Sequence, residues 1–332
     1  MTPFVLENQE GLRLRGLDFG ATLTSLTLPV GGERREVLLG CADEAYASQQ
    51  VWLGAVAGRF ANRIGGAELV RDGQRWPLDA NQPPHCLHGG RDGFHRRRWQ
   101  IAELAADKVR LTLLSPAGDQ GFPGQLQTSL EYRLEGQDLV VEFEASTDAP
   151  TPVSLTSHAY FNLDGDGPEG DVRQHAITLR ADQFLPTDAS GLPLAISPVE
   201  GPFDLRSERL IGQAWLSHPQ QMQAKGYDHA YLLKEAARLR GAGQAWAARV
   251  RSGDRQLAME VYTNQPSLQF YSGNWLASTP NRAGQCYQDH AGFCLEAQQL
   301  PDSPNRPELG DPWLLPGQRY HHQTRYRFIT TR

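Results

Sequence analysis

The sequence contains little cysteine, and the four cysteines that it has are far apart. Cys41, Cys86, Cys286 and Cys294 show no CxxC spacing. In a chain of 332 residues, scattered cysteines are typical of reduced thiols in a cytosolic protein, although the sequence leaves one disulfide open. We therefore expect a cytoplasmic location.

Long hydrophobic runs are also absent. No window approaches the roughly 18 apolar residues that a membrane-spanning helix needs. The N-terminal stretch carries Glu7 and Glu10 before any long apolar segment, so we expect no signal peptide. The 32 basic and 38 acidic residues give a formal net charge of -6, with no long run of either sign. We therefore expect neither nucleic acid nor a membrane as a partner, and favour a neutral polar ligand.

Motifs for phosphate loops and serine nucleophiles are missing as well. The sequence has no GxxxxGK[ST], no GxSxG and no SxxK. The stretch GDGPEG, residues 165–170, matches GxGxxG in form, but it contains Pro168 and precedes a strand-like segment rather than a helix. We predict a loop there and no dinucleotide site.

Glycine (33) and proline (22) are frequent, and they separate short segments of alternating apolar and polar residues. KVRLTLLSP, LQTSLEYRL and LVVEFEAST, within residues 108–147, follow one another across turn sequences and predict an antiparallel meander. Further strands are expected within 175–180, 228–233, 257–263, 267–276 and 320–331, and short helices at 43–50 and 235–246. The pattern predicts an all-β antiparallel sandwich with few short helices, as a single domain over residues 1–332.

One carboxylate lies inside an otherwise apolar and neutral stretch, GFCLEAQQL, residues 292–300. Alternation places Glu296 on one face with Cys294 and Gln298, while the other face is apolar, which predicts a strand. A carboxylate on a semi-buried face is costly unless a partner compensates its charge. Glu296 therefore needs either a partner or a function.

A second polar face lies in TPVSLTSHAYFNL, residues 151–163. Period 2 places Thr156, His158, Tyr160 and Asn162 on one face. Such a face suits a sugar, because hydroxyl groups need hydrogen-bond partners and the apolar ring faces need an aromatic surface. The alternative is a structural histidine whose hydrogen bonds are satisfied.

Three further segments carry polar candidates. His88 precedes two glycines and either presents its ring to a pocket or is structural, and neither an HxH nor an HExxH pair suggests a metal nearby. Asn62 and Arg63 lie in GRFANRIGG, where a solvated arginine is the common case. Asp228 begins a predicted strand, where an aspartate is often only a turn residue.

Seven motifs together resemble the aldose 1-epimerase family, also called the galactose mutarotase family. In chain order they are GRFANRI, LHGGRDGFHRRRW, TPVSLTSHAYFNL, GPFDLR, GYDHAYLL, LQFYSGNWL and GFCLEAQQLPDSPNRPE, from residue 58 to residue 308. Their conjunction in this order makes the resemblance specific. The resemblance implies a large antiparallel β supersandwich and an isomerase that needs no metal and no cofactor.

The resemblance also implies roles for individual residues. Glu296 matches the family's catalytic base, and His158 matches its catalytic acid. Substrate-binding roles fall on Asn62, Arg63, His88, Tyr160, Asp228 and Gln269. The implied partner is a small-molecule sugar, and the protein itself is expected to be a monomer or a homodimer.

The implied reaction interconverts the α and β anomers of free aldohexoses such as galactose and glucose. Glu296 would take the proton of the anomeric hydroxyl while His158 protonates the ring oxygen, and the open aldehyde would turn about C1–C2 and reclose. A poorly solvated strand is expected to raise the pKa of Glu296. A carboxylate in the same pocket is expected to keep His158 protonated.

Three alternatives stay open. A glycoside hydrolase would use Asp228 and Glu296 as its two carboxylates. A hexose 6-phosphate epimerase would use basic residues such as Arg96 and Arg98, which we expect to share the solvated face of a strand over residues 95–99. A non-catalytic sugar-binding protein on the same fold would not need both Glu296 and His158.

Overall fold

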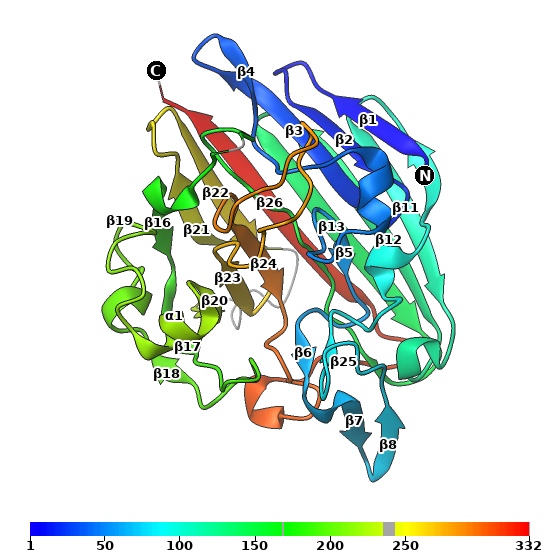
Figure 1. Cartoon of the computed structure of the whole chain (residues 1–332). Coiled ribbons are helices and arrows are strands. Elements are labelled where there is room, and N and C mark those ends of the chain that lie inside the picture. Colours follow the sequence, from blue (N-terminus) through cyan, green and yellow to red (C-terminus); the bar gives the residue numbers. More distant parts are fainter. Residues whose placement is uncertain (168, 235–242, 332) are drawn as a thin grey trace.

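The computed structural model describes residues 1–167, 169–234 and 243–331, in which strands predominate (Figure 1). Its largest sheet has nine antiparallel strands in the order β10-β11-β12-β13-β26-β22-β21-β16-β19. Their bounds are Gln100–Leu104 (β10), Lys108–Ser115 (β11), Leu126–Glu135 (β12), Asp138–Thr147 (β13), Tyr320–Thr330 (β26), Leu257–Thr263 (β22), Ala245–Arg251 (β21), Ala176–Leu179 (β16) and Arg209–Leu210 (β19). The expected meander is confirmed, because β11, β12 and β13 pair in sequence order.

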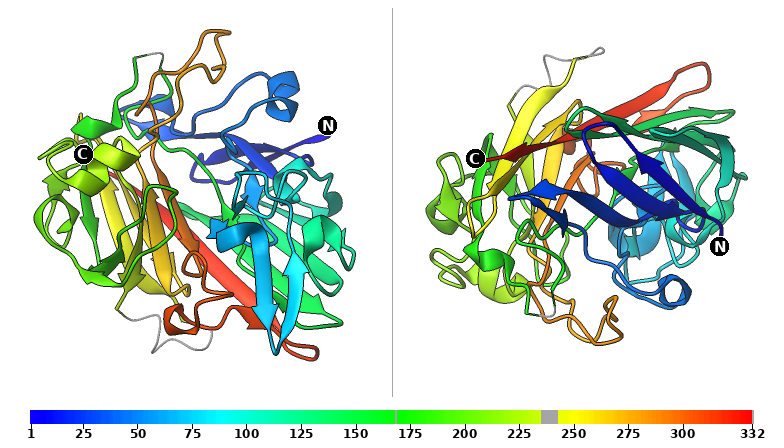
Figure 2. Two further views of the ribbon diagram at one scale, coloured as in Figure 1. Left: turned by 60° about the horizontal axis from the view of Figure 1, so that its bottom comes forward. Right: turned by 90° about the horizontal axis from the view of Figure 1, so that it is seen from above.

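Two smaller antiparallel sheets lie over one face of the large sheet (Figure 1, Figure 2). The first, in the order β1-β2-β3-β4, contains Pro3–Glu7, Arg13–Leu17, Thr22–Val30 and Glu33–Glu36. The second, in the order β18-β17-β20-β23-β24, contains Ser197–Pro198, Ala181–Leu185, Asp228–Leu233, Ser267–Tyr271 and Cys294–Gln298. The strands expected within 228–233, 257–263, 267–276 and 320–331 are therefore confirmed as β20, β22, β23 and β26.

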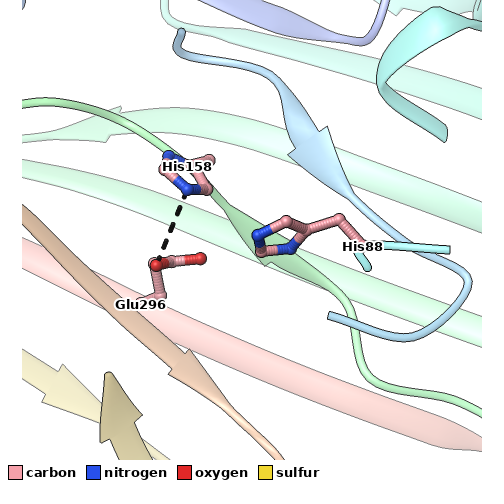
Figure 3. A group of neighbouring side chains, drawn as sticks. All are labelled: His88, His158 and Glu296. Atoms are coloured by element: carbon pink, nitrogen blue, oxygen red, sulfur yellow. Dashed lines mark ion pairs between the residues drawn. The ribbon is translucent and has the colours of Figure 1, made fainter. Parts of the chain in front are cut away.

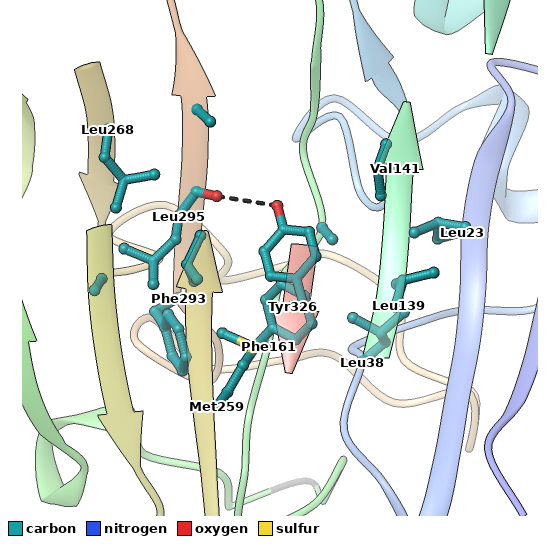
Figure 4. Close-up of a cluster of buried hydrophobic side chains, with 14 of the residues drawn as sticks. Leu23, Leu38, Leu139, Val141, Phe161, Met259, Leu268, Phe293, Leu295 and Tyr326 are labelled. Carbon is teal, nitrogen blue, oxygen red and sulfur yellow. Dashed lines mark hydrogen bonds between the residues drawn. The ribbon is translucent and has the colours of Figure 1, made fainter. Parts of the chain in front are cut away.

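A hydrophobic core fills the space between these layers (Figure 4). Leu23 of β3, Val141 of β13 and Tyr326 of β26 belong to the same buried cluster as Leu268 of β23 and Leu295 of β24. The hydroxyl of Tyr326 donates to the carbonyl oxygen of Leu295 at 3.2 Å, which ties β24 to the large sheet. Both small sheets share one core with the large sheet, so the predicted all-β sandwich is confirmed.

Short elements connect the layers. The two-stranded pairs are β14–β25 (Thr151–Pro152, Trp313–Leu314), β15–β5 (Thr156–Ser157, Val56–Ala57), β6–β9 (Arg63–Ile64, Cys86–Leu87) and β7–β8 (Glu68–Arg71, Gln74–Pro77). The described residues form one α-helix, α1 (Pro219–Ala224), and the 3₁₀ helices η1 (Asp43–Ala47), η2 (Gly65–Ala67), η3 (Phe94–Arg96), η4 (Asp119–Gly121), η5 (Val172–Gln174), η6 (Gly201–Phe203) and η7 (Pro307–Leu309).

The expected helices are correspondingly short. The one predicted over residues 43–50 is the 3₁₀ helix η1, and the candidate over residues 235–246 falls mostly outside the described residues. Within the described ranges, no helix combines the length and the apolar character that crossing a membrane requires.

The strand expected over residues 95–99 is wrong. Phe94 and Trp99 are both buried and their rings meet edge to face at 5.7 Å, whereas a strand would point residues five positions apart to opposite faces. The 3₁₀ turn η3 resolves this conflict. Arg98 forms an ion pair with Asp18 at 3.0 Å, and Arg96 donates to the carbonyl oxygen of Ala47 at 3.3 Å.

Candidate active site

Strand β24 separates an apolar environment from a polar one, as its alternation predicts. Leu295 and Ala297 lie in the main core, whereas Glu296 lines a cavity on the other side. The pairing of β23 with β24 places Gln269 opposite Glu296, and β20 pairs with the other edge of β23. Three adjacent strands thereby bring Asp228, Gln269 and Glu296 to one face of the second small sheet.

His158 comes from the chain that follows β15. Its backbone N–H donates to the carbonyl oxygen of Ala55 at 2.9 Å, and its own carbonyl accepts the N–H of Gly54 at 3.1 Å. The expected alternation is confirmed, because Phe161 lies in the main core while His158 and Tyr160 line the cavity. The two backbone hydrogen bonds hold the backbone of His158 in place, and its imidazole lies in the cavity wall.

A cavity of about 310 Å³ lies where these segments meet. His88, His158 and Glu296 line it, and Figure 3 shows these three side chains next to one another on three different segments of the chain. Its wall consists of Gln50, Val51, Trp52, Asn62, Arg63, Gln82, Leu87, His88, His158, Tyr160, Asp228, Tyr271, Trp275 and Glu296. Every predicted site residue is in this wall except Gln269, which donates its Nε2–H to Oδ1 of Asp228 at 2.7 Å.

Three aromatic residues of the wall, Trp52, Tyr271 and Trp275, were missed by sequence reasoning. Trp275 is 55% exposed at the cavity and has Nζ of Lys225 lying 3.7 Å from the centre of its ring. Tyr271 and Trp275 belong to the LQFYSGNWL motif, whose aromatic residues are the signal that could have identified them. Trp52 lies outside the seven motifs, so no motif pointed to it. Its φ of 53° belongs to a backbone region that non-glycine residues rarely adopt.

The central pair is Glu296 and His158, which are 2% and 4% exposed. Nε2 of His158 lies 3.8 Å from Oε1 of Glu296, and Oε2 of Glu296 is buried with no hydrogen-bond partner. Burial raises the pKa of Glu296 well above its ordinary value, and the negative charge of Asp228 adds to this effect. That direction confirms the expectation for Glu296.

The expectation for His158 is wrong for the free site. Burial lowers the pKa of His158 to about 4, so the imidazole is neutral near pH 7. The loss of hydration around a charged ring outweighs the attraction of a carboxylate that is itself inclined to hold a proton. Burial therefore disfavours the charged form of both groups in the pair.

His88 is held as a hydrogen-bond donor toward the cavity. Its Nδ1 accepts the backbone N–H of Asn62 at 3.2 Å, and burial lowers its pKa well below the ordinary value. A neutral imidazole that accepts at Nδ1 carries its hydrogen on Nε2. Gly89 follows with φ +84°, and a Cβ there would lie 2.0 Å from the carbonyl oxygen of Gly58, so this loop requires glycine.

Tyr160 and Arg63 are oriented by neighbouring side chains and backbone. The hydroxyl of Tyr160 donates to the carbonyl oxygen of Val51 at 2.9 Å, and burial keeps its pKa well above 10, so this donor persists. Nε of Arg63 donates to Oε1 of Gln82 at 2.7 Å. This bond orients the guanidinium group of Arg63 and uses only its Nε. The two terminal nitrogens remain available to donate to a ligand.

A metal ion could be considered at His88, His158 and Glu296, whose ligand atoms lie within 4.8 Å of one another. A metal on Nε2 of His88 would occupy that lone pair and move the hydrogen to Nδ1, where it would oppose the N–H of Asn62. The hydrogen bond therefore favours a neutral, donating His88 over a metal ligand.

Comparisons with known proteins identify the family of this chain. The sequence profile of the family described as aldose 1-epimerase matches residues 3–327. The chain is 44% identical over 331 residues to aldose 1-epimerase of Escherichia coli K12, covering 98% of this chain and 94% of the relative. It is 39% identical over 317 residues to galactose mutarotase of Rattus norvegicus, covering 94% and 90%.

Solved structures share the fold. An aldose epimerase homologue from C. elegans aligns with a TM-score of 0.90 at 26% identity, covering 100% of this chain and 99% of the other. A galactose 1-epimerase from Lactobacillus acidophilus aligns with a TM-score of 0.84 at 28% identity, covering 99% and 94%. The chain therefore belongs to the aldose 1-epimerase family, and it is an isomerase with the galactose mutarotase-like fold that acts on a small-molecule sugar.

Proposed function

We propose that this isomerase interconverts the α and β anomers of free aldohexoses such as galactose and glucose, with Glu296 as the base and His158 as the acid. The proposal rests on one observation, which is that Glu296 and His158 face each other inside one cavity. Nε2 of His158 and Oε1 of Glu296 are 3.8 Å apart, too far for a direct hydrogen bond, and Oε2 of Glu296 has no partner. A sugar can therefore offer its anomeric hydroxyl to one group and its ring oxygen to the other.

The reaction balances with these two residues alone. Glu296 takes the proton of the hydroxyl on C1, the oxygen's electron pair forms the C1=O bond, and the bond from C1 to the ring oxygen breaks. The ring oxygen takes the proton of Nε2 of His158. Rotation about C1–C2 presents the other face of the aldehyde, and the reverse transfers close the ring and restore both residues.

The buried location of the pair favours the open form of the sugar. Before ring opening the pair is a carboxylate and an imidazolium, and afterwards both groups are neutral. Burial disfavours both charged forms, as the raised pKa of Glu296 and the lowered pKa of His158 show. Ring opening therefore removes two poorly solvated charges, which assists the difficult half of the reaction.

The other residues suit the remaining hydroxyl groups. Asp228, oriented by Gln269, would accept from hydroxyls remote from C1, and Arg63 and His88 would donate. The faces of Trp52 and Trp275 would cover the apolar faces of the sugar ring. Asn62 is held by its neighbours, because its Oδ1 accepts the N–H of Arg63 at 2.8 Å.

The alternatives have weaker support. The ion-pair neighbour of Glu296 is an imidazole rather than a second carboxylate, and Asp228 is bound by Gln269, which fits a hydrolase poorly. Arg63 is the one cationic side chain in the described cavity wall, while Arg96 and Arg98 are engaged elsewhere. A phosphate dianion would thus find little compensation and would be repelled by Asp228. A sugar-binding module would have no use for a matched acid and base.

We also propose that residues 1–332 form one domain that works without a metal or a cofactor. The main core draws on residues from Phe4 to Phe328, which supports a single unit. We propose that the protein works as a monomer or as a homodimer. The four cysteines are unpaired, which suits the proposed cytoplasmic location.

Polarimetry on freshly dissolved α-galactose and α-glucose tests the proposal. The expected result is a faster approach to the equilibrium rotation, with a kcat/KM for glucose well above that for glucose 6-phosphate. Release of sugar from a glycoside would indicate a hydrolase, and binding with no acceleration would indicate a binding protein. A preference for the phosphorylated sugar that is lost in the Arg96→Ala, Arg98→Ala double variant would overturn the substrate assignment.

A further inference from the structure

Cys294 lies beside the proposed acid, although the reaction above gives it no role. It is on β24 two residues before Glu296, it is fully buried, and its Sγ lies 3.5 Å from Nδ1 of His158. Nε2 of the same ring faces Glu296 at 3.8 Å, as the dashed line in Figure 3 shows. The two nitrogens of His158 therefore have different neighbours, a thiol and a carboxylate.

The reaction cycle places a requirement on Nδ1. The proton that His158 gives and takes belongs to Nε2, so Nε2 alternates between an N–H and a lone pair. A neutral imidazole has one hydrogen, and once Nε2 has given its proton that hydrogen is on Nδ1. Nδ1 must therefore stay protonated throughout, and its neighbour must accept a hydrogen bond. A neighbour that donated to Nδ1 would hold the tautomer in which Nε2 cannot accept a proton.

We propose that Cys294 is a positioning residue whose Sγ accepts the Nδ1–H of His158 and so keeps proton exchange on Nε2. The inference rests on the proposed role of His158 as the acid. The carbonyl of His158 itself is a second acceptor close to the ring, and one of its two lone pairs accepts the N–H of Gly54 at 3.1 Å. Sγ of Cys294 is the side-chain acceptor within reach of Nδ1 among the described residues.

A thiol is suited to this position because it is a weak acceptor without charge. A carboxylate at Nδ1 would stabilise the imidazolium and raise the pKa of His158, which would make the ring a weaker acid. Burial, together with Glu296 and Asp228, raises the pKa of the Cys294 thiol well above its ordinary value, so the thiol stays neutral. The hydrogen on Nδ1 is then held with little change in acidity at Nε2.

The position of the ring itself depends on other residues. The ring of His158 contacts Tyr160 at 5.0 Å, His88 at 5.3 Å and Trp52 at 6.3 Å between ring centres. Removing Sγ should leave these contacts in place and change mainly the nitrogen that carries the hydrogen. A loss of kcat with little change in KM is therefore the expected signature.

Nitrogen NMR on protein labelled with ¹⁵N-histidine tests the contact without reference to activity. The signals of His158 are assigned by their disappearance in His158→Asn. At neutral pH the expected result is a neutral ring with its hydrogen on Nδ1 in the unaltered protein, and a mixture of tautomers in Cys294→Ala. A ring with its hydrogen on Nε2 in the unaltered protein would overturn the proposal.

Kinetics supply the second test. Cys294→Ala should lower kcat about tenfold with KM within twofold, and Cys294→Ser, whose hydroxyl also accepts, should restore most of kcat. Cys41→Ala is the matched control, because it removes a buried thiol whose partner is Tyr46, and it should keep kcat. An unchanged kcat in Cys294→Ala would overturn the inference.

The two proposals fail in different ways. If Cys294→Ala does not fold, the tautomer in the unaltered protein and in Cys294→Ser still decides the role of Sγ. If His158→Asn keeps full mutarotation, the proposed acid is wrong, whatever the tautomer of the ring. Equal losses of kcat in the alanine and serine variants, with an unchanged tautomer, would reduce Cys294 to a packing residue.

Discussion

Two buried carboxylates, Asp138 on β13 and Glu296 on β24, lie in opposite electrostatic surroundings. Their exposed fractions are nearly equal, 3% and 2%. Burial raises the pKa of Asp138, but the hydrogen bonds from Arg327 and Arg325 outweigh it and leave the pKa below the ordinary value. Glu296 has no such arginine among its ion-pair contacts in the described residues, and its pKa is raised. Similar solvent exposure thus accompanies opposite pKa shifts, and the arginines beside Asp138 account for the lowered one.

The difference separates a structural carboxylate from the one that we propose as the base. Asp138 pairs with Arg327 across β13 and β26, so its charge helps to hold the large sheet together. Glu296 is left without compensation, so as a carboxylate it pulls strongly on any hydroxyl proton in the cavity. The missing compensation lowers the stability of this site, and it suits the role of base that we propose for Glu296.

Glu296→Gln should have the largest effect of the changes that probe this comparison. Gln keeps the size and the hydrogen bonding of Glu but cannot accept a proton, so kcat should fall by about 10²–10⁴-fold. Calorimetry should still show galactose binding. A variant that keeps half of the mutarotation rate in polarimetry would remove Glu296 from the role of base.

His158→Asn removes the neighbour of Glu296 and should be nearly as damaging. Protonation of the ring oxygen would then depend on water, so we expect a loss in kcat of at least about 10²-fold. Polarimetry measures the rate, and a thermal unfolding curve close to that of the unaltered protein shows that the fold is kept. A full rate would refute the assignment of the acid.

Asp138→Asn should affect stability and leave catalysis alone. It removes charge-assisted hydrogen bonds to two arginines that are partly exposed, so we expect a loss of about 1–2 kcal/mol in the free energy of unfolding. Urea unfolding measures this loss. The kcat/KM for galactose should stay within twofold, and a larger drop would contradict the separation of the two carboxylates.

The pH dependence of unfolding should have opposite signs for the two carboxylates. The folded pKa of Glu296 lies above the unfolded value of about 4.3, so its contribution is lost as pH rises from that value through the folded pKa. Glu296→Gln should therefore gain stability over the unaltered protein as pH rises from 4 to 7. The folded pKa of Asp138 is lowered, so its contribution is present above about pH 3.9 and is lost as pH falls through the folded pKa. Urea unfolding at pH 4 and pH 7 gives the difference for Glu296→Gln, and unfolding at about pH 3 and about pH 5 gives the difference for Asp138→Asn.

Treatment with EDTA should have the smallest effect, which is none. We assign the histidines to proton transfer and hydrogen bonding, and the contact of Asn62 with Nδ1 of His88 opposes metal coordination there. The measurement is the mutarotation rate before and after dialysis against the chelator. Abolished activity that zinc restores would show that the metal-free mechanism is wrong.

The strands whose residues alternate between apolar and polar could be predicted from the sequence. Strand β24 and the meander β11–β13 alternate cleanly, and turn residues mark their ends, so local geometry determines them. The role of Glu296 could be approached in the same way, because a lone carboxylate in an apolar strand needs an explanation. The assignment of the remaining site residues came from the resemblance of seven ordered motifs.

Features that depend on contacts between distant segments could not be predicted. Cys294 and His158 are 136 positions apart in the sequence, and no local sequence pattern indicates that they are in contact. The neutral state of His158 depends on burial by several segments, which composition does not reveal. The turn at Phe94 arises because that ring and Trp99 must reach the same side of the chain.

Strand β26 has a consequence for the order in which the protein is made. It lies between β13 and β22, so residues 320–330 join two halves of the large sheet that are synthesised earlier. Until the ribosome delivers them, the nascent chain presents two unpaired strand edges, which other chains can join. Tyr326 arrives in the same step, and its hydroxyl is the link to the strand of Glu296. The strand that carries Glu296 therefore gains this link to the large sheet late in synthesis.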